Sequence, residues 1–308
     1  MQPGVVPRVS EDENSAVDPP ANSPEQSVGH VSDTALWVAV HRATESKRKD
    51  ALFRDPYAEQ LAGERGKRIV GQLETAASSA WSIITRTVVL DELILGAIRD
   101  GADTVLNLAA GLDTRPYRLS LPPGTRWIEV DFPEMMAYKA DKLRDAQPRC
   151  ALERVPFDLT DRLAREQFFT RVSRESRQTL VITEGLLIYL SPEDVAALAT
   201  DLHAMPHFHW WIADVLTPEL LEYLLKRQFK AFATGSVQMR FAPPGGIAYF
   251  ERFGWRAHTV RKITEESRRL KRQMPRAWLY RLLGALSPKH VREQYGRFES
   301  YFVTLERI

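Results

Sequence analysis

Small residues and a carboxylate at the ends of two predicted strands have the chemistry of a nucleotide site. Ala109, Ala110 and Gly111 follow the apolar run 104–108, and bare backbone in such a turn lets a ligand approach closely. Asp131 ends the next apolar run, where a carboxylate can accept both ribose hydroxyls of an adenosine. The turn holds one glycine instead of three spaced ones, which argues against a dinucleotide. Taken alone, the turn could be free of ligand, and Asp131 could be a solvated acid at the end of a strand. The turn and the acid together indicate adenosine.

Two further charged residues stand within apolar sequence. Arg86 lies in the largely apolar predicted helix 80–98, and Glu184 follows the apolar run 179–183. A charged group is costly to bury without a partner of opposite charge or a hydrogen bond. We therefore expect a buried partner for Arg86, with a surface arginine as the alternative, and a cationic or hydrogen-bonding partner for Glu184.

Several motifs in a fixed order carry a resemblance to a known family. They are the segments 107–119, 129–133, 183–190 and 42–46, together with Asp55-Pro56. With them the chain resembles the leucine carboxyl methyltransferase family over residues 33–308. More closely, it resembles the bacterial branch of S-adenosylmethionine-dependent O-methyltransferases, which includes enzymes of polyketide tailoring.

The resemblance implies a site for S-adenosylmethionine and a role for each matching residue. Arg86 matches the arginine that clamps the methionine carboxylate, Asp131 the ribose acid, Asp158-Leu159 the pair against adenine, and Glu184 the acid near the methionine ammonium. The full set expected to bind the cofactor is Arg86, Ala109, Ala110, Gly111, Asp113, Asp131, Phe132, Asp158, Leu159, Glu184 and Gly185. Ala109 stands where the family usually has glycine, and we expect its methyl group to narrow the pocket or weaken binding.

The elements that must position these residues follow from the apolar pattern. Helical spacing predicts helices at 34–43, 57–62 and 80–98, and a further one capped by Ser191. Short apolar runs predict strands at 104–108, 126–130, 152–157, 179–183, 210–215, 258–260 and 301–305. Together with the resemblance this predicts an α/β fold of the class I methyltransferase, Rossmann-like type: a mostly parallel sheet with helices on both faces, a helical N-terminal extension and a lid inserted after the fifth strand.

The same pattern predicts how the chain is organised. Residues 1–29 are rich in proline and polar residues and predict a disordered acidic tail. We expect residues 30–308 to form one methyltransferase domain. Its predicted parts are a helical cap (30–100), a cofactor-binding core (101–216), a lid or substrate segment (217–250) and a basic C-terminal part that completes the sheet (251–308).

The expected reaction needs positioning more than covalent chemistry, because the sulfonium is already an activated electrophile. A carboxylate acceptor, with a pKa of about 4, needs no general base, whereas a phenol or alcohol does. No catalytic residue is assigned, and the histidines at 203, 207 and 209 lack the spacing of a metal site, so we expect no metal. Candidate residues of the acceptor pocket are Tyr189, Tyr223, Phe229 and Met239. Alternatively, the aromatic residues of 217–250 belong to the core of the fold, and this alternative applies more to the first half of the segment.

Composition limits the class of protein and its partners. The chain has 308 residues, 44% of them hydrophobic and 27% charged, with a net charge of +2, which is typical of a globular protein. One cysteine excludes a disulfide scaffold, no apolar run is long enough to span a bilayer, and nothing marks the chain for export, so we expect a cytoplasmic protein. The expected partner is a small anionic or phenolic acceptor, with no membrane; the oligomeric state is not indicated.

Two alternatives to the enzyme stay open. Basic residues between 252 and 297 indicate either nucleic-acid binding or modification, or a solvated helix face, and we favour the helix face. Ala109 leaves room for a protein that binds the cofactor without turnover.

Overall fold

The computed structural model describes residues 31–72, 74–232, 238–279, 282, 288 and 297–308. The predicted tail, residues 1–29, lies outside them. The helices are α1 (Val31–Ser46), α2 (Ala58–Gln72), α3 (Glu74–Arg99), α4 (Arg115–Arg118), α5 (Pro133–Lys142), α6 (Arg162–Glu175), α7 (Pro192–His203), α8 (Pro218–Phe232) and α9 (Ile263–Arg269), with 3-10 helices η1 (Leu187–Tyr189) and η2 (Gly246–Phe253). The strands are β1 (Thr104–Leu108), β2 (Arg126–Asp131), β3 (Ala151–Pro156), β4 (Thr179–Thr183), β5 (Phe208–Leu216), β6 (Trp255–Lys262) and β7 (Ser300–Arg307).

The seven strands form one sheet in the order β3-β2-β1-β4-β5-β7-β6. The first five strands are parallel, and β7 runs antiparallel to both β5 and β6. The expected mostly parallel sheet is confirmed. The strand order reverses direction between β1 and β4, and ligands of open α/β sheets bind at the carboxyl ends of the strands beside such a switch.

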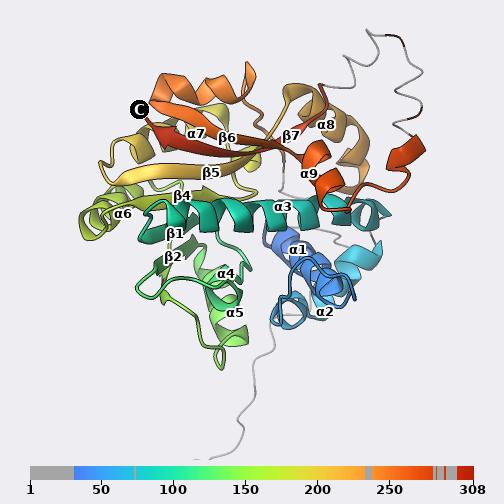
Figure 1. Cartoon of the computed structure of the whole chain (residues 1–308), viewed down its shortest axis with the longest axis horizontal. Coiled ribbons are helices and arrows are strands. Elements are labelled where there is room, and N and C mark those ends of the chain that lie inside the picture. Colours follow the sequence, from blue (N-terminus) through green and yellow to red (C-terminus); the bar gives the residue numbers. More distant parts are fainter. Residues whose placement is uncertain (1–30, 73, 233–237, 280–281, 283–287, 289–296) are drawn as a thin grey trace, which may run out of the picture.

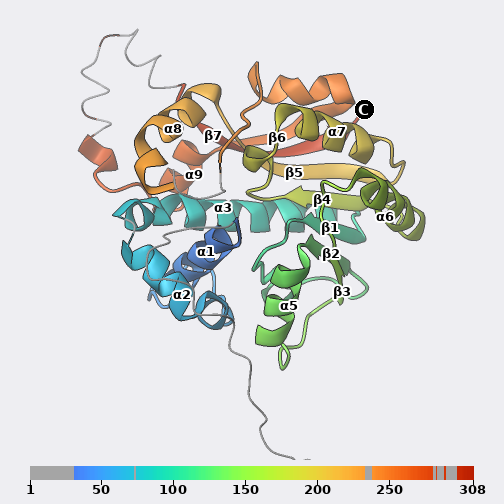
Figure 2. The ribbon, with the colours of Figure 1, turned by 180° about the vertical axis from the view of Figure 1, so that it is seen from behind.

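Helices cover both faces of this sheet (Figures 1 and 2). On one face, Phe168 and Phe169 of α6, Leu198 of α7 and Phe250 of η2 pack in one hydrophobic cluster with strand residues such as Trp211. On the other face, α3 and α9 pack against alternate residues of the same strands. This alternation follows from the two-residue period of a strand, which sends successive side chains to opposite faces.

The N-terminal helices form the expected helical extension. Figure 1 shows α3 crossing the molecule, with α1 and α2 packed together beside it. Leu36, Leu61 and Ile69 from α1 and α2 share a small core with Tyr117 and Met135 from the β1–β2 and α5 region. The extension therefore contacts the segment that follows β1, which is where the site begins.

Two expectations about individual elements need correction. The helix expected at 57–62 continues as α2 to Gln72, although Gly63 breaks its geometry with a φ of 56°. Within 217–250, core residues were expected more in the first half, but among the described residues Phe241 and Tyr249 of the second half are buried in the main cluster, whereas Tyr223 on α8 is 41% exposed. The apolar residues of a lid and of a core have the same spacing in sequence, so the spacing could not show which half of 217–250 is buried.

No helix in the described part of the chain has the length and apolar character needed to cross a membrane.

Candidate functional site at the carboxyl ends of the strands

The guanidinium of Arg86, on α3, lies between two carboxylates at the end of the sheet. Nη1 donates to Oδ2 of Asp214 at 3.1 Å. Nε lies 2.9 Å from Oε1 of Glu184, as an ion pair without hydrogen-bond geometry. Burial disfavours the charged form, but the two carboxylates outweigh it, and the pKa of Arg86 is raised. The buried partner expected for Arg86 is thus present, and it is a pair of acids supplied by β5 and the residue after β4.

Glu184 is held by two arginines. Its Oε2 accepts from Nη1 of Arg115 at 2.7 Å, while Oε1 faces Arg86. Burial alone would raise the pKa of Glu184, but Arg115 and Arg86 bring that pKa below its ordinary value. The carboxylate is therefore ionised at neutral pH, with cationic partners from the chain itself.

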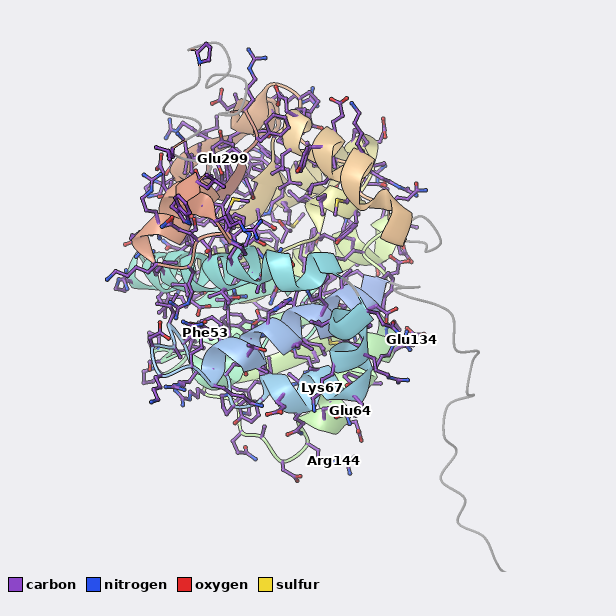
Figure 3. All side chains as sticks on the ribbon, turned by 90° about the vertical axis from the view of Figure 1, so that its right-hand side faces the viewer. Phe53, Glu64, Lys67, Glu134, Arg144 and Glu299 are labelled. Carbon is purple, nitrogen blue, oxygen red and sulfur yellow. The ribbon has the colours of Figure 1, made fainter. Side chains whose placement is uncertain are left out.

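Arg115, the first residue of α4, joins Glu184 to two more acids. Nε donates to Asp91 at 2.6 Å and Nη1 to Asp113 at 2.8 Å. Arg118 also binds Asp91, at 2.6 and 2.8 Å, and lies over the ring of Phe53, labelled in Figure 3. Burial opposes ionisation of Asp113, but Arg115 dominates and holds the pKa of that carboxyl well below its usual range. Of these residues, only Asp113 belongs to the set expected from the sequence to bind the cofactor; Asp91, Arg115 and Arg118 do not.

The turn after β1 has the sharp backbone that a close ligand approach requires. Ala109 has a φ of 55° and Gly111 a φ of 46°, both in the left-handed region. That region costs an L-residue roughly 1–2 kcal/mol, whereas glycine enters it freely. The departure at Ala109 therefore falls on a strained position.

Asp131, at the end of β2, closes the turn. Its carboxylate accepts from the backbone N–H of Gly111 at 2.7 Å and of Phe132 at 2.8 Å. It forms no ion pair within the described part of the chain. Burial consequently raises the pKa of Asp131. A carboxylate anchored on backbone N–H groups with lone pairs to spare suits hydroxyl donors.

Tyr189, on η1, lies beside the Arg86 cluster. Its phenol hydrogen-bonds to Thr34 of α1, and its titration is influenced by both Arg86 and Asp214. Burial raises the pKa of Tyr189, so the ring stays neutral at pH 7. The first turn of α1 thereby reaches the same edge of the sheet as the ends of β4 and β5.

Other predicted residues are not drawn into this cluster. Asp158 is exposed and caps its own turn, accepting from Thr160 N–H at 2.8 Å, while Leu159 is half-buried against the main core. Phe132 is 37% exposed. Of the pocket candidates, Tyr223 contacts Phe298 edge-on at 5.7 Å between ring centroids, and Met239 is half-buried two residues before Phe241. The side chain of Phe229 lies outside the described residues.

The three clustered histidines have structural contacts elsewhere. His207 Nδ1 lies 2.5 Å from the carbonyl of Ser173, His203 Nε2 lies 3.2 Å from the carbonyl of Ile308, and His209 stacks against Trp210. Among the described residues, no group of three or more His, Cys, Asp or Glu could hold a metal ion.

The residues present fit a zwitterionic amino acid attached to a ribose. Nε of Arg86 faces Glu184 at 2.9 Å and Nη1 donates to Asp214, whereas Nη2 makes no hydrogen bond within the described part of the chain. Nη2 is therefore the donor that a ligand carboxylate can use. The lone pairs of Asp131 would serve a ribose diol. Arg86 and Asp131 thus provide, at one edge of the sheet, what the two polar parts of S-adenosylmethionine require.

Comparison with known proteins decides the family. A model of the leucine carboxyl methyltransferase family matches residues 35–203, more than half of the chain. The chain belongs to the leucine carboxyl methyltransferase family. It is an enzyme that uses S-adenosylmethionine as methyl donor.

Relatives of this methyltransferase support the assignment. A protein of Frankia alni named "Putative S-adenosyl-L-methionine-dependent methyltransferase" is 32% identical over 241 residues, which is 73% of this chain and 82% of the relative. A second Frankia alni protein with the same description is 36% identical over 210 residues, 62% of this chain and 74% of that one.

Solved structures show the fold of the methyltransferase. A DUF574 family protein from Streptomyces avermitilis has a TM-score of 0.57 at 14% identity and covers 91% of this chain and 98% of its own. A methyltransferase structure from Thermobifida fusca has a TM-score of 0.53 at 16% identity and covers 91% and 96%. The predicted class I methyltransferase fold is confirmed.

Proposed function

We propose that this methyltransferase transfers the methyl group to an oxygen of a small metabolite, a carboxylate or a hydroxyl, with a polyketide-like acid as one such acceptor. The observation that carries the proposal is that the phenol of Tyr189, which stays protonated, lies beside the Arg86 cluster, while the described histidines at 203, 207 and 209 have their contacts elsewhere. Because a carboxylate arrives ionised, it needs a hydrogen-bond donor and a dry pocket but no base.

The residues that would hold the cofactor follow from the site. Arg86 would bind the methionine carboxylate, Asp131 the ribose hydroxyls, and the backbone of Ala110 and Gly111 would line the turn; Asp158 and Leu159 would face adenine. Bound there, the cofactor supplies an activated methyl group. Glu184 keeps Arg86 and Arg115 in place, and the ammonium would add to its partners. Orientation of the acceptor oxygen and exclusion of water are what the chain contributes.

Two observations favour a carboxylate over a hydroxyl. The described histidines at 203, 207 and 209 contact Ile308, Ser173 and Trp210 respectively, so none of these three serves as a base here. The pKa of Tyr189 is raised, which makes its phenol a hydrogen-bond donor at neutral pH and a poor base. A hydrogen-bond donor at this place suits a methyl acceptor that is an ionised carboxylate.

Three ion-paired arginines in the described stretch of the C-terminal part support a small acceptor over nucleic acid. Arg261 pairs with Glu92 at 2.6 Å and with Glu266 at 2.9 Å, and Arg269 pairs with the same two acids. Arg272 pairs with Glu45 at 2.8 Å. Basic residues that are neutralised within the fold release few counterions on binding a phosphate backbone.

Methyl transfer to a panel of acceptors tests the proposal. Labelled cofactor is incubated with aliphatic and aromatic carboxylic acids and with matched phenols and alcohols. We expect base-labile methyl esters, formed at a rate that does not rise with pH above about pH 6, because the acceptor is already ionised. Products formed only from phenols, at a rate that rises with pH, would exclude the carboxylate, and products on nitrogen or on oligonucleotides would exclude O-methylation of a small acceptor. Cofactor bound without any transfer would favour a protein without turnover, as the strain at Ala109 allows.

Three further expectations stay predictions: the division of residues 30–308 into cap, core, lid and C-terminal part, the cytoplasm as the compartment, and polyketide tailoring as the setting.

A further inference from the structure

The end of β5 carries a carboxylate that organises the cofactor side of the site. We propose that Asp214 is a positioning residue: it sets the orientation of Arg86 toward the carboxylate of the cofactor's amino-acid part. The proposal rests on the assignment of Arg86 to that carboxylate under the proposed function.

Both oxygens of Asp214 are used, on two different segments. Oδ2 accepts from Arg86 Nη1 at 3.1 Å, and Oδ1 accepts from the backbone N–H of Gly185 at 2.6 Å. The side chain is 15% exposed. One carboxylate therefore connects α3, the loop after β4 and β5 itself, the three elements that meet at this edge of the sheet.

Gly185 explains why the two contacts belong together. Its φ is 63°, and a Cβ placed there would lie 3.3 Å from Nη1 of Arg86. The guanidinium thus lies directly against the backbone of Gly185, and Asp214 binds both sides of this contact. With Nη1 held by Asp214 and Nε facing Glu184, Nη2 is the nitrogen that has neither a hydrogen bond nor an ion pair among the described residues.

The net charge of the cluster and the orientation of Arg86 predict opposite changes in ligand affinity when Asp214 is replaced, so the direction of the change tests the proposal. Three arginines at 86, 115 and 118 face four acids at 91, 113, 184 and 214. Asp214→Asn would bring the cluster to balance and make it more attractive to an anion. If Asp214 acts by orientation, the same change weakens binding, because the amide NH₂ faces a donor in either orientation, Arg86 Nη1 or the N–H of Gly185.

The experiment compares two ligands in calorimetric titrations. S-adenosylhomocysteine carries the amino-acid part, and 5′-methylthioadenosine lacks it. We expect Asp214→Asn to weaken S-adenosylhomocysteine by roughly tenfold or more, the effect of losing one charge-assisted hydrogen bond, and to leave 5′-methylthioadenosine unchanged. In an Arg86→Ala background, Asp214→Asn should add no further loss. Asp103→Asn, which removes the partner of Arg177 at the amino ends of the strands, is the matched control and should leave both ligands unchanged.

A second variant keeps the proposal testable if Asp214→Asn does not fold. Gly185→Ala places a methyl group against the guanidinium from the other side, and it should likewise weaken S-adenosylhomocysteine and spare 5′-methylthioadenosine. Equal or tighter binding of S-adenosylhomocysteine, or equal weakening of both ligands, would overturn the positioning role. Wild-type protein that binds neither ligand would instead overturn the proposed cofactor site.

Discussion

Arg42 and Asp55 form a buried ion pair that fastens the N-terminal helices to the turn after β1. Arg42 Nε donates to Asp55 Oδ2 at 2.9 Å, and its Nη2 donates to the carbonyl of Leu112 at 2.5 Å. The same Asp55 oxygen accepts from the hydroxyl of Thr114 at 2.6 Å. The side chains of Arg42 and Asp55 are 8% and 0% exposed. The segment that carries Gly111 and Asp113 is therefore held from outside the sheet.

Breaking this pair should destabilise the protein. Asp55→Ala leaves the guanidinium of Arg42 buried without its carboxylate, and we expect a loss of about 3–5 kcal/mol in the free energy of unfolding. Urea unfolding, monitored by circular dichroism, measures this change in the free energy of unfolding. Lys67→Gln is the control, because Lys67 and Glu64 form an exposed pair on α2 (Figure 3) and its loss should leave the urea midpoint unchanged. Equal midpoints for Asp55→Ala and wild type would contradict the role given to the pair.

Arg115 should be required for stability in a pH-dependent way. In wild type, the pKa values of Glu184 and Asp113 are lowered, so these acids contribute stability that is present above about pH 4 and is lost as the pH falls through their folded-state values. In Arg115→Gln the cation that does most to lower both pKa values is lost while burial stays, so both pKa values rise relative to wild type, and the deficit shrinks as the pH falls toward the variant's folded-state values. We expect a deficit of about 3–5 kcal/mol at pH 7.

Urea unfolding of wild type and Arg115→Gln at pH 7 and pH 5 checks the sign. The deficit should shrink toward pH 5. A deficit that stays constant or grows on acidification would show that the carboxylates are not the reason for it.

Ala109→Gly should stabilise the protein. The left-handed φ of 55° costs alanine roughly 1–2 kcal/mol, and glycine loses part of that advantage through its greater freedom in the unfolded chain, which leaves a gain of about 0.5–1 kcal/mol. Ala110→Gly is the matched control: Ala110 is not in the left-handed region, so the same change should cost stability there. Chemical unfolding of the two variants compares them, and a loss of stability in Ala109→Gly would contradict the strain.

The local pattern of the chain is sufficient to predict the central strands. β1 and β4 have the predicted bounds, 104–108 and 179–183, because each is a short apolar run buried on both faces. The helix expected to end at Ala62 does lose helical geometry at Gly63, although the chain then resumes a helix. Such boundaries depend on neighbouring residues alone.

Features set by distant contacts were not predictable in this way. Phe241 and Tyr249 enter the main core by packing on each other and on η1 and α7, which no spacing rule contains. Asp214 is different, because the signal that singled out Glu184, a lone acid in an apolar run, is also present at 208–216. The resemblance drew attention to Glu184 and gave no position for Asp214.

The central claim is that S-adenosylmethionine binds at the end of β2 and beside Arg86. Calorimetric titration of wild type and Asp131→Ala with S-adenosylhomocysteine tests it most directly. Asp131 has no ion pair among the described residues and accepts two backbone N–H bonds, so the variant should fold. We predict one bound ligand for wild type and an affinity about tenfold to a hundredfold lower for Asp131→Ala, because a carboxylate that binds hydroxyl groups is lost. Absence of binding to wild type, or equal affinity in the variant, would contradict the account.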